Sequence, residues 1–410
     1  MSTGKKIWIF NHYAITPDMP GGSRHYDLGK ELVKKGYDVT IIASSFHYSK
    51  HTEMKLSKGE RWKIESVDGV RFVWIKTIGY SGNNWRRIAN MLSYTIRSYF
   101  LGINKLNHLI PKPDIVIGSS VHLFAVLSAY YIARHYHARF IMEVRDLWPQ
   151  TLVDMGALNP KSLMARTMYA LEKFLYGKAE KIITLLPSAS DYITKCGVSK
   201  ENVVWIPNCV DIARFNNTKI PKANVNGEFK VLYLGAHGQA NNLDAVIDAA
   251  KIVQNKGFKN IQFILVGHGT EKPRLIKRKQ EMNLEIIEFR EPIPKTEVPA
   301  YIELFDVCLF TLLDVDIYKY GISFNKVFDY LASGKPVIMA GNPINSIIEE
   351  ANCGISVQPN NPDALANAVI ELARLSSEER ENMGQKGREY VEKLYDTRII
   401  ANKLIECIES

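Results

Sequence analysis

The chain has 410 residues, more than one hydrophobic core normally supports, and its 46% hydrophobic and 23% charged residues are ordinary for a globular protein. The net charge of +9 favours anionic partners, but no arginine-rich tract or nucleic-acid-binding motif is present, which argues against nucleic acid. No apolar run reaches the ~18 residues of a membrane span, the first apolar stretch is too short for a signal peptide, and five scattered cysteines have no pairing or metal-ligand spacing. We therefore expect a cytoplasmic protein of about two domains.

Apolar runs of strand length alternate with helical patterns from end to end, which is typical of parallel sheets with helices on both faces. One helix, Arg24–Lys35, is expected to end at Gly36, because glycine is the preferred residue after a helix. The strands expected in the first half are Lys6–Asn11, Asp38–Ala43, Arg71–Lys76, Asp114–Gly118, Phe140–Val144, Lys181–Leu185 and Val203–Ile206.

Residues 85–107, which lie between two of these strands, are expected to form a helix with an apolar stripe beside basic and aromatic residues. The stripe consists of Ile88, Leu92, Ile96, Tyr99, Ile103 and Leu106, and the cations are Arg86, Arg87, Arg97 and Lys105. Such a helix could lie on an anionic membrane surface. Alternatively, its stripe packs on the sheet.

A second alternating series follows Pro207–Gly227, a segment that is rich in Asn, Lys and Pro, lacks periodicity and is expected to link two domains. The strands expected in this series are Lys230–Leu234, Gln262–Val266, Glu285–Phe289, Val307–Phe310 and Pro336–Ala340. Doubly wound α/β domains bind ligands at the carboxyl ends of their strands. We therefore expect two Rossmann-like domains that face each other across a cleft.

Several strands are followed by loops that could receive a phosphate, because glycine allows close backbone approach and a helix start attracts anions. The candidate residues in these loops are Gly21, Gly22, Gly238, Gln239, Asn241, Gly267, Gly269 and Arg290. The G-x-G-x-x-G fingerprint is absent, so a usual dinucleotide site is not expected. Each loop alone is also compatible with an ordinary turn, and His237 is expected to be a solvated loop histidine.

The strand Phe140–Val144 runs into three charged residues among apolar ones, namely Glu143, Arg145 and Asp146. Charged side chains are seldom buried without partners, so this strand end is a candidate for catalysis or ligand binding. Alternatively, one of the two carboxylates simply pairs with Arg145.

The stretch Ser323–Val337 reads SFNKVFDYLASGKPV and places Lys326 and Asp329 in the first turns of a helix that precedes a strand. Residues three apart share a helix face, and the free N–H groups of a helix start favour an anion. Gly321, Ile322 and Ser323 could add further backbone donors. The pattern fits a nucleotide-sugar pocket, although an amphipathic helix with one solvated ion pair would look the same.

Taken together, these motifs resemble the retaining glycosyltransferases of the GT-B type, in family 4. The closest likeness is to bacterial enzymes that add deoxy- or amino-sugars during surface-polysaccharide assembly. The resemblance covers essentially the whole chain and rests on residues 20–24 (PGGSR), 143–149 (EVRDLWP), 206–211 (IPNCVD) and 325–337 (NKVFDYLASGKPV).

The resemblance implies an acceptor-binding domain over residues 1–206, a nucleotide-sugar-binding domain over 207–392, and a helix over 393–410 that crosses back to the first domain. It implies transfer from a nucleotide diphospho-sugar, expected to be UDP-linked, to a lipid-linked or saccharide acceptor at the inner face of the membrane. The implied catalytic residues are Asp146, with Glu143 as second choice, and Lys326. The implied donor-binding residues are the eight loop residues above together with Gly321, Ile322, Ser323, Asn325, Lys326 and Asp329, and the implied acceptor-binding residues are Arg24, Arg145 and Trp148.

Three departures from the family pattern qualify these roles. Asp329 stands where the family has the second glutamate of a Glu-x7-Glu element, which holds the ribose, and Gly321 replaces the first glutamate. The family's diphosphate-binding Arg and Lys are replaced by Gly238, Gln239 and Asn241, so charge neutralisation falls to Lys326. The family's sugar-binding histidine is replaced by Arg145 or Asp146.

No cofactor and no metal are expected. Asp314-Val315-Asp316 matches the Asp-x-Asp metal pattern only formally, and enzymes of the GT-B type generally lack a motif-bound cation. Two other functions are considered. A nucleotide-sugar 2-epimerase of the same fold would convert a donor without an acceptor, and a non-catalytic polyanion-binding protein would use the basic surface.

Overall fold

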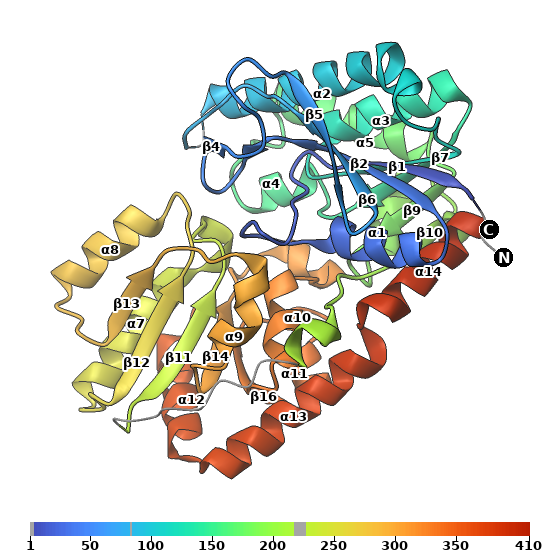
Figure 1. Cartoon of the computed structure of the whole chain (residues 1–410). Helices are drawn as coiled ribbons and strands as arrows, with labels where there is room; N and C mark the ends of the chain where they lie inside the picture. The colour runs from blue at the N-terminus through green and yellow to red at the C-terminus, as the bar shows by residue number, and fades with distance from the viewer. Residues whose placement is uncertain (1–3, 83, 217–226) are drawn as a thin grey trace.

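The computed structural model describes residues 4–82, 84–216 and 227–410 (Figure 1). It consists of two α/β domains, each built around its own parallel sheet, as expected from the alternating strand and helix patterns. The second part of the expected linker, residues 217–226, lies outside the described residues.

In the described part of the first domain, eight strands form one sheet in the order β10-β9-β8-β7-β1-β2-β6-β5. Their bounds are β1 Lys6–Phe10, β2 Asp38–Ser44, β5 Trp62–Val67, β6 Val70–Ile75, β7 Ile115–Ser119, β8 Arg139–Val144, β9 Lys181–Thr184 and β10 Val203–Trp205, and a separate small pair joins β3 (Phe46–His47) to β4 (Thr52–Glu53). The helices are α1 Arg24–Lys34, α2 Trp85–Asn104, α3 Leu123–Tyr136, α4 Gln150–Asp154, α5 Leu163–Tyr176 and α6 Ser190–Ile193.

In the described part of the second domain, six parallel strands are ordered β13-β12-β11-β14-β15-β16. Their bounds are β11 Phe229–Leu234, β12 Ile261–Val266, β13 Ile287–Arg290, β14 Val307–Thr311, β15 Val337–Ala340 and β16 Gly354–Val357. The helices are α7 Leu243–Asn255, α8 Lys272–Glu281, α9 Val298–Ile302, α10 Asn325–Ala332, α11 Ile347–Glu350, α12 Pro362–Arg374, α13 Ser377–Leu394 and α14 Thr397–Glu409.

Within the described part of the eight-stranded sheet, one strand departs from the expected parallel arrangement, and the separate β3–β4 pair is antiparallel as well. β5 runs antiparallel to β6, and the two are joined by Asp68 and Gly69, whose φ angles of 50° and 82° are those of a tight hairpin turn. β5 forms the edge of the sheet and its residues are only partly buried. The expectation of exclusively parallel strands is therefore wrong at this edge.

The strand order gives each sheet a switch point at which chain connections diverge. β1 lies between β7 and β2, and β11 lies between β12 and β14. Loops that follow such central strands leave a crevice at the carboxyl edge of the sheet, where ligands bind. The loop after β1 and the segment that leads into α10 belong to these two edges, and they meet each other between the domains.

The C-terminal helices connect the two domains (Figure 1). α13 packs on α10 of the second domain, whereas α14 packs on α1 of the first. Ile400, Leu404 and Ile408 of α14 are buried in the same apolar cluster as Ile7 and Ile9 of β1. The end of the chain therefore contributes to the core of the first domain, and Glu409 of α14 pairs with Lys5, which directly precedes β1.

Candidate active site

The two domains touch where the glycine loop after β1 meets the start of α10. A Cβ atom added at Gly22 would lie 2.2 Å from Nδ2 of Asn325, so any other residue here would force the Asn325 side chain to move. Gly21 has a φ of 135°, and a Cβ atom added there would lie 2.8 Å from the Tyr48 hydroxyl oxygen. The structure thus brings together Gly21, Gly22 and Asn325, three of the expected donor-binding residues.

α10 begins without a side-chain cap, because its N-cap residue, Phe324, has no side-chain acceptor for the N–H groups of the first turn. The N–H groups of a helix start carry a partial positive charge and need acceptors. Lys326 lies in this first turn, so backbone donors and a cation occur side by side. This combination suits an anionic ligand such as a diphosphate.

The ammonium group of Lys326 is held among uncharged partners. Its Nζ donates to Oδ1 of Asn241 at 2.6 Å and to the Tyr233 hydroxyl at 3.2 Å, and it lies 4.6 Å from the centre of the Tyr233 ring. No ion pair to Lys326 occurs within the described residues. Burial lowers the pKa of Lys326 to about 7. A negatively charged ligand would supply the missing counter-charge.

Gly267 and Gly269 serve a packing role that the sequence did not indicate. A Cβ atom at Gly267 would lie 1.8 Å from the Gly235 carbonyl oxygen, and one at Gly269 would lie 2.3 Å from that of His237. The two loops therefore lie in direct backbone contact, and His237 is fully buried between them. The expectation of a solvated His237 is wrong, and burial lowers its pKa to about 4. Gly238 and Gln239 continue this loop towards Asn241.

Asp329 does not share surroundings with Lys326, although the two are three residues apart. Its carboxylate pairs with Lys295, whose Nζ lies 2.6 Å from Oδ1, and both side chains are about nine-tenths buried. The alternative of a solvated Lys326–Asp329 ion pair is therefore excluded. Asp329 instead faces the junction of the two domains, where Asn325 also lines the pocket.

Two of the three expected backbone donors ahead of α10, Gly321 and Ile322, are already paired within the protein. The N–H of Gly321 bonds to the Tyr318 carbonyl oxygen, and the N–H of Ile322 bonds to Oδ1 of Asn345 at 2.8 Å. Oγ of Ser323 accepts from the backbone N–H of Asn208 at 2.8 Å. The N–H groups of Gly321 and Ile322 are therefore taken up within the second domain, whereas Ser323 uses its hydroxyl and carbonyl oxygens to hold Asn208.

Glycine at position 321 has a steric reason. Its φ is 96°, and an added Cβ atom would lie 2.5 Å from Cδ of Pro187 in the first domain. A glutamate in this place, as in the family pattern, would collide with Pro187. Asp314 and Asp316, which lie shortly before Gly321 in the chain, are both exposed, and Oδ2 of Asp316 lies 3.8 Å from Nζ of Lys319.

Arg290 is held away from a ligand role by its own neighbours. Its guanidinium bonds to both carboxylate oxygens of Glu288 and to the Tyr301 hydroxyl. Its carbonyl oxygen accepts from Gly267 N–H and from Nζ of Lys272. The expectation that this backbone group reads a base is not supported by these contacts.

Glu143 and Arg24 form a buried ion pair and not an open acceptor site. Nε of Arg24 lies 2.9 Å from Oε1 of Glu143, and the other nitrogens of Arg24 donate to the carbonyl oxygens of Ile206 and Pro207. Oε2 of Glu143 lies 2.7 Å from His25. Burial opposes the charge of Glu143, but His25 and Arg24 hold its pKa well below the usual value. Both expected roles are corrected: the pair anchors the chain where it leaves the first domain.

Asp146 and Arg145 differ from this pair because they remain accessible. Asp146 is exposed, and none of the described residues donates a hydrogen bond to its carboxylate. Desolvation by the protein atoms around this loop raises the pKa of Asp146 above its ordinary value, although the charge of Arg145 opposes the shift. Arg145 is half-buried and anchored through its backbone N–H, which donates to Oγ of Ser120. Trp148 follows on the same loop and is also half-buried.

Two features of this region were not predicted. Lys295, the partner of Asp329, has no local sequence signal, because the two residues are 34 positions apart. His12 and His122 form a second feature, in which Nδ1 of His12 lies 2.8 Å from Nε2 of His122 at the carboxyl edge of the first sheet. Burial lowers the pKa of His122 to about 3, so both rings are neutral. The sequence signal for this pair would have been that each histidine follows within three residues of an apolar strand, β1 for His12 and β7 for His122.

Comparison with known families divides the chain between two related models. Residues 21–214 match the model described as Glycosyltransferase Family 4, and residues 228–374 match that described as Glycosyl transferases group 1. Among curated proteins, the putative colanic acid biosynthesis glycosyl transferase WcaI of Escherichia coli (strain K12) is 22% identical over 96% of this chain and 97% of its own length. The probable glycosyltransferase WbjE of Pseudomonas aeruginosa is 20% identical over 80% and 82%.

Solved structures share the fold. Sucrose-phosphate synthase from Thermosynechococcus elongatus superimposes with a TM-score of 0.75 at 18% identity, covering 99% of this chain and 98% of that one. Anabaena HepE in complex with UDP and glucose gives a TM-score of 0.67 at 14% identity, covering 99% of each chain. Family models, relatives and fold agree: the chain is a glycosyltransferase of the GT-B fold and belongs to glycosyltransferase family 4, group 1.

Proposed function

We propose that this enzyme transfers a sugar, with retention of configuration, from a nucleotide diphospho-sugar to a lipid-linked or saccharide acceptor in bacterial surface-polysaccharide synthesis. The observation that carries the proposal is the uncapped start of α10, where Lys326 lacks an anionic partner among the described residues. The name of WcaI, which refers to colanic acid biosynthesis, supports a role in polysaccharide synthesis. The UDP bound in the HepE complex supports a UDP-linked donor.

In the proposed reaction, the bond between the anomeric carbon and the diphosphate breaks, and its electron pair stays on the phosphate oxygen. Lys326 and the first N–H groups of α10 stabilise this developing charge, which is an electrostatic role that needs no metal. The acceptor oxygen bonds to the same face of the anomeric carbon. Its proton passes to the Asp146 carboxylate, whose raised pKa makes it a better base than an ordinary aspartate.

We also propose that the first domain docks on an anionic phospholipid surface through α2 and its neighbours α3 and α5. Exposed apolar side chains occur on all three helices: Trp85, Ile88, Leu92, Ile96 and Phe100 on α2, Tyr131 on α3, and Leu163, Met164 and Phe174 on α5. α2 and α3 contain no Asp or Glu, whereas Arg86, Arg97 and Arg134 are exposed cations. Apolar and basic side chains together match an anionic bilayer surface.

The expected stripe on residues 85–107 thus divides between two faces. Ile88, Leu92 and Ile96 are exposed, whereas Tyr99 and Ile103 are partly buried and pack on the core. Leu106 is buried, but it lies beyond α2 in a short 3-10 turn. The side of α2 that packs on the sheet is formed by other residues, including Met91, Tyr94 and Leu101. None of the helices in the described ranges is both long and apolar enough to cross a bilayer.

The experiment that tests the function starts with a thermal-shift screen of UDP, GDP and their sugars, because a specific ligand stabilises by mass action. The nucleotide sugar that binds is then incubated with and without a membrane extract that contains lipid-linked acceptors. Transfer only with the extract, and a product whose anomeric proton shows the donor's configuration by NMR, would support the proposal. Conversion of the donor alone would favour a 2-epimerase, and an inverted product would contradict retention.

A further inference from the structure

The segment after β13 connects the donor side of the second domain to the glycine loop of the first. The backbone N–H of Lys295 donates to the Met19 carbonyl oxygen, and that of Thr296 donates to the Pro17 carbonyl oxygen, each at 3.2 Å. These carbonyl groups belong to the loop that brings Gly22 against Asn325. The backbone of Lys295 is therefore fixed by the opposite domain.

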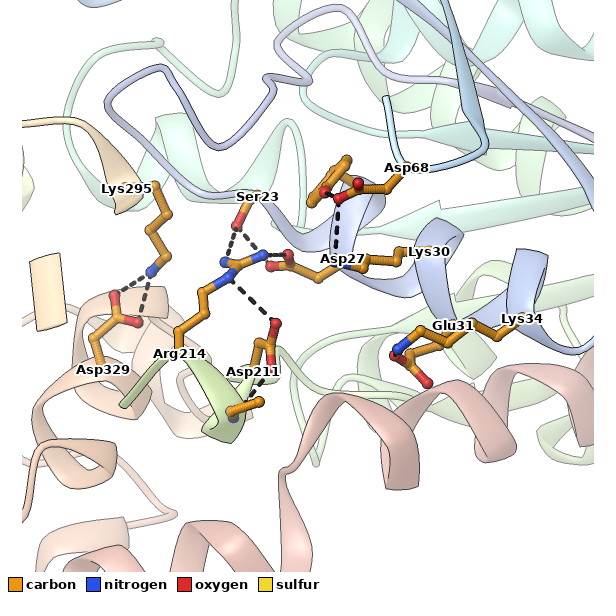
Figure 2. Close-up of polar contacts among 12 residues, drawn as sticks. Ser23, Asp27, Lys30, Glu31, Lys34, Asp68, Asp211, Arg214, Lys295 and Asp329 are labelled. Carbon is orange, nitrogen blue, oxygen red and sulfur yellow. Dashed lines mark hydrogen bonds and ion pairs between the residues drawn. The ribbon is translucent and has the colours of Figure 1, made fainter. Parts of the chain in front are cut away.

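The side chain of Lys295 reaches back into its own domain. Figure 2 shows its ammonium group directed at the Asp329 carboxylate, with both oxygens in contact. The side chains are 11% and 8% exposed, so water competes little for either charge. No other hydrogen bond to the Asp329 carboxylate occurs within the described residues.

A second charged pair lies beside the first. Arg214, from the segment between the domains, bonds to Asp27 of α1, to Ser23 and to Asp211 (Figure 2). Asp27 and Arg214 line the same small pocket as Lys295 and Asp329. Removing Lys295 would leave Asp329 as an uncompensated negative charge next to this array, free to turn towards Arg214.

We propose that Lys295 is a positioning residue that couples donor binding to the approach of the two domains. Two oxygens of a carboxylate offer about four lone-pair sites, so the ammonium group orients Asp329 and still leaves acceptor capacity for a ribose diol. The ammonium group is in place only when Met19 and Pro17 hold the Lys295 backbone. Asp329 is consequently oriented for the ribose only when the domains are together. This inference rests on the proposed function, since it assumes a nucleotide donor.

The test compares binding of UDP with binding of 2′,3′-dideoxy-UDP by calorimetry, in the full chain. The wild type is expected to bind the dideoxy compound at least about tenfold more weakly, as for the loss of hydrogen bonds to a charged group. Lys295→Met should lose about tenfold or more in UDP affinity and bind both compounds equally. Lys295→Arg, which keeps the charge, should recover part of the difference.

Two further variants keep the result interpretable. Lys319→Met removes an exposed cation from the same domain and should leave the ratio of the two affinities unchanged. Lys295→Met combined with Asp329→Asn removes both buried charges, so it should fold if the single variant does not, and it should bind the two compounds equally. A Lys295→Met protein that is folded and retains the wild-type ratio would overturn the inference. A wild type that binds neither UDP nor GDP would instead overturn the proposed function.

Discussion

At the scale of single residues, the charge of Lys326 depends on what it binds. Its pKa is lowered to about 7 by burial, so the free enzyme holds it largely neutral above that pH. A bound diphosphate favours the ammonium form and raises the pKa again. Binding must then take up a proton wherever the pH lies above the pKa of the free enzyme and below that of the complex.

Calorimetry in buffers of different ionisation enthalpy would measure this uptake. We expect about one proton per UDP near pH 8.5 and little from Lys326 near pH 6, where the side chain is already charged. Lys326→Met should show no uptake near pH 8.5. Equal uptake in the wild type and in Lys326→Met would mean that another group titrates.

Lys326 should also matter for the rate. Lys326→Ala is expected to lower kcat by about 10²-fold or more, the usual effect of removing one electrostatic stabiliser of a transition state. Circular dichroism would check that the variant is folded. A near-native kcat with unchanged UDP affinity would remove Lys326 from the mechanism.

Asp146 is expected to act on the acceptor and not on the donor. Asp146→Asn keeps the size of the side chain and removes the proton acceptor, so transfer should fall by about 10²-fold or more while UDP affinity stays within about twofold. Glu143→Gln is the instructive comparison, because it disrupts a buried ion pair and should lower thermal stability. If Asp146→Asn transferred sugar at the wild-type rate, the assignment of the base would be wrong.

At the scale of elements, one face of α2 packs on the sheet, and the opposite face is proposed to bind an anionic membrane surface. We expect the protein to sediment with vesicles that contain phosphatidylglycerol at low salt, and less at high salt, because screening weakens the attraction. Replacement of two exposed cations, Arg86→Glu with Arg97→Glu, should abolish sedimentation. Lys277→Glu with Lys393→Glu, on the second domain, should not. Binding that ignores both charge pairs, or that is absent at low salt, would contradict the docking surface.

The sequence predicted most strands of the two large sheets within two residues, because buried parallel strands are nearly continuous apolar runs, as in Ile261–Val266. The edge strand β16 was not predicted. β5 was overlooked because it lies at an edge, is only partly buried and carries charges, even though Asp68-Gly69 is a strong hairpin signal. The hydrogen bond between Asn241 and Lys326 was predictable in outline, because both residues follow strands whose carboxyl ends lie at the same edge of the second sheet. Sequence alone could not separate Asp146 from Glu143, since a buried ion pair and a reactive carboxylate have the same composition. The structure distinguishes them, because Glu143 is buried and paired with Arg24, whereas Asp146 is exposed.

At the scale of the whole molecule, the two domains are held together by contacts from separate parts of the chain. One apolar cluster contains residues of both domains, for example Val144 and Ile322. Lys295, Thr296 and Asn208 add hydrogen bonds across the junction. The C-terminal part of the chain also connects the domains, because α14 follows α13 of the second domain and packs on α1 of the first. These contacts hold the two domains in a fixed arrangement and leave the loops at the carboxyl ends of the strands available for ligands.

The narrowest point of this junction gives a prediction about domain separation. A side chain at Gly22 would collide with Asn325, since even a Cβ atom would lie 2.2 Å from Nδ2. Gly22→Val should therefore push the domains apart, increase the radius of gyration in small-angle scattering and lower transferase activity by about tenfold or more, as misplacement of reacting groups does. Gly177→Val is the matched control, because a Cβ atom there meets its nearest neighbour at 3.5 Å. It should change neither quantity. An unchanged radius of gyration and full activity in Gly22→Val would show that the cleft tolerates a bulkier residue, and that closure of the domains does not depend on the contact between Gly22 and α10.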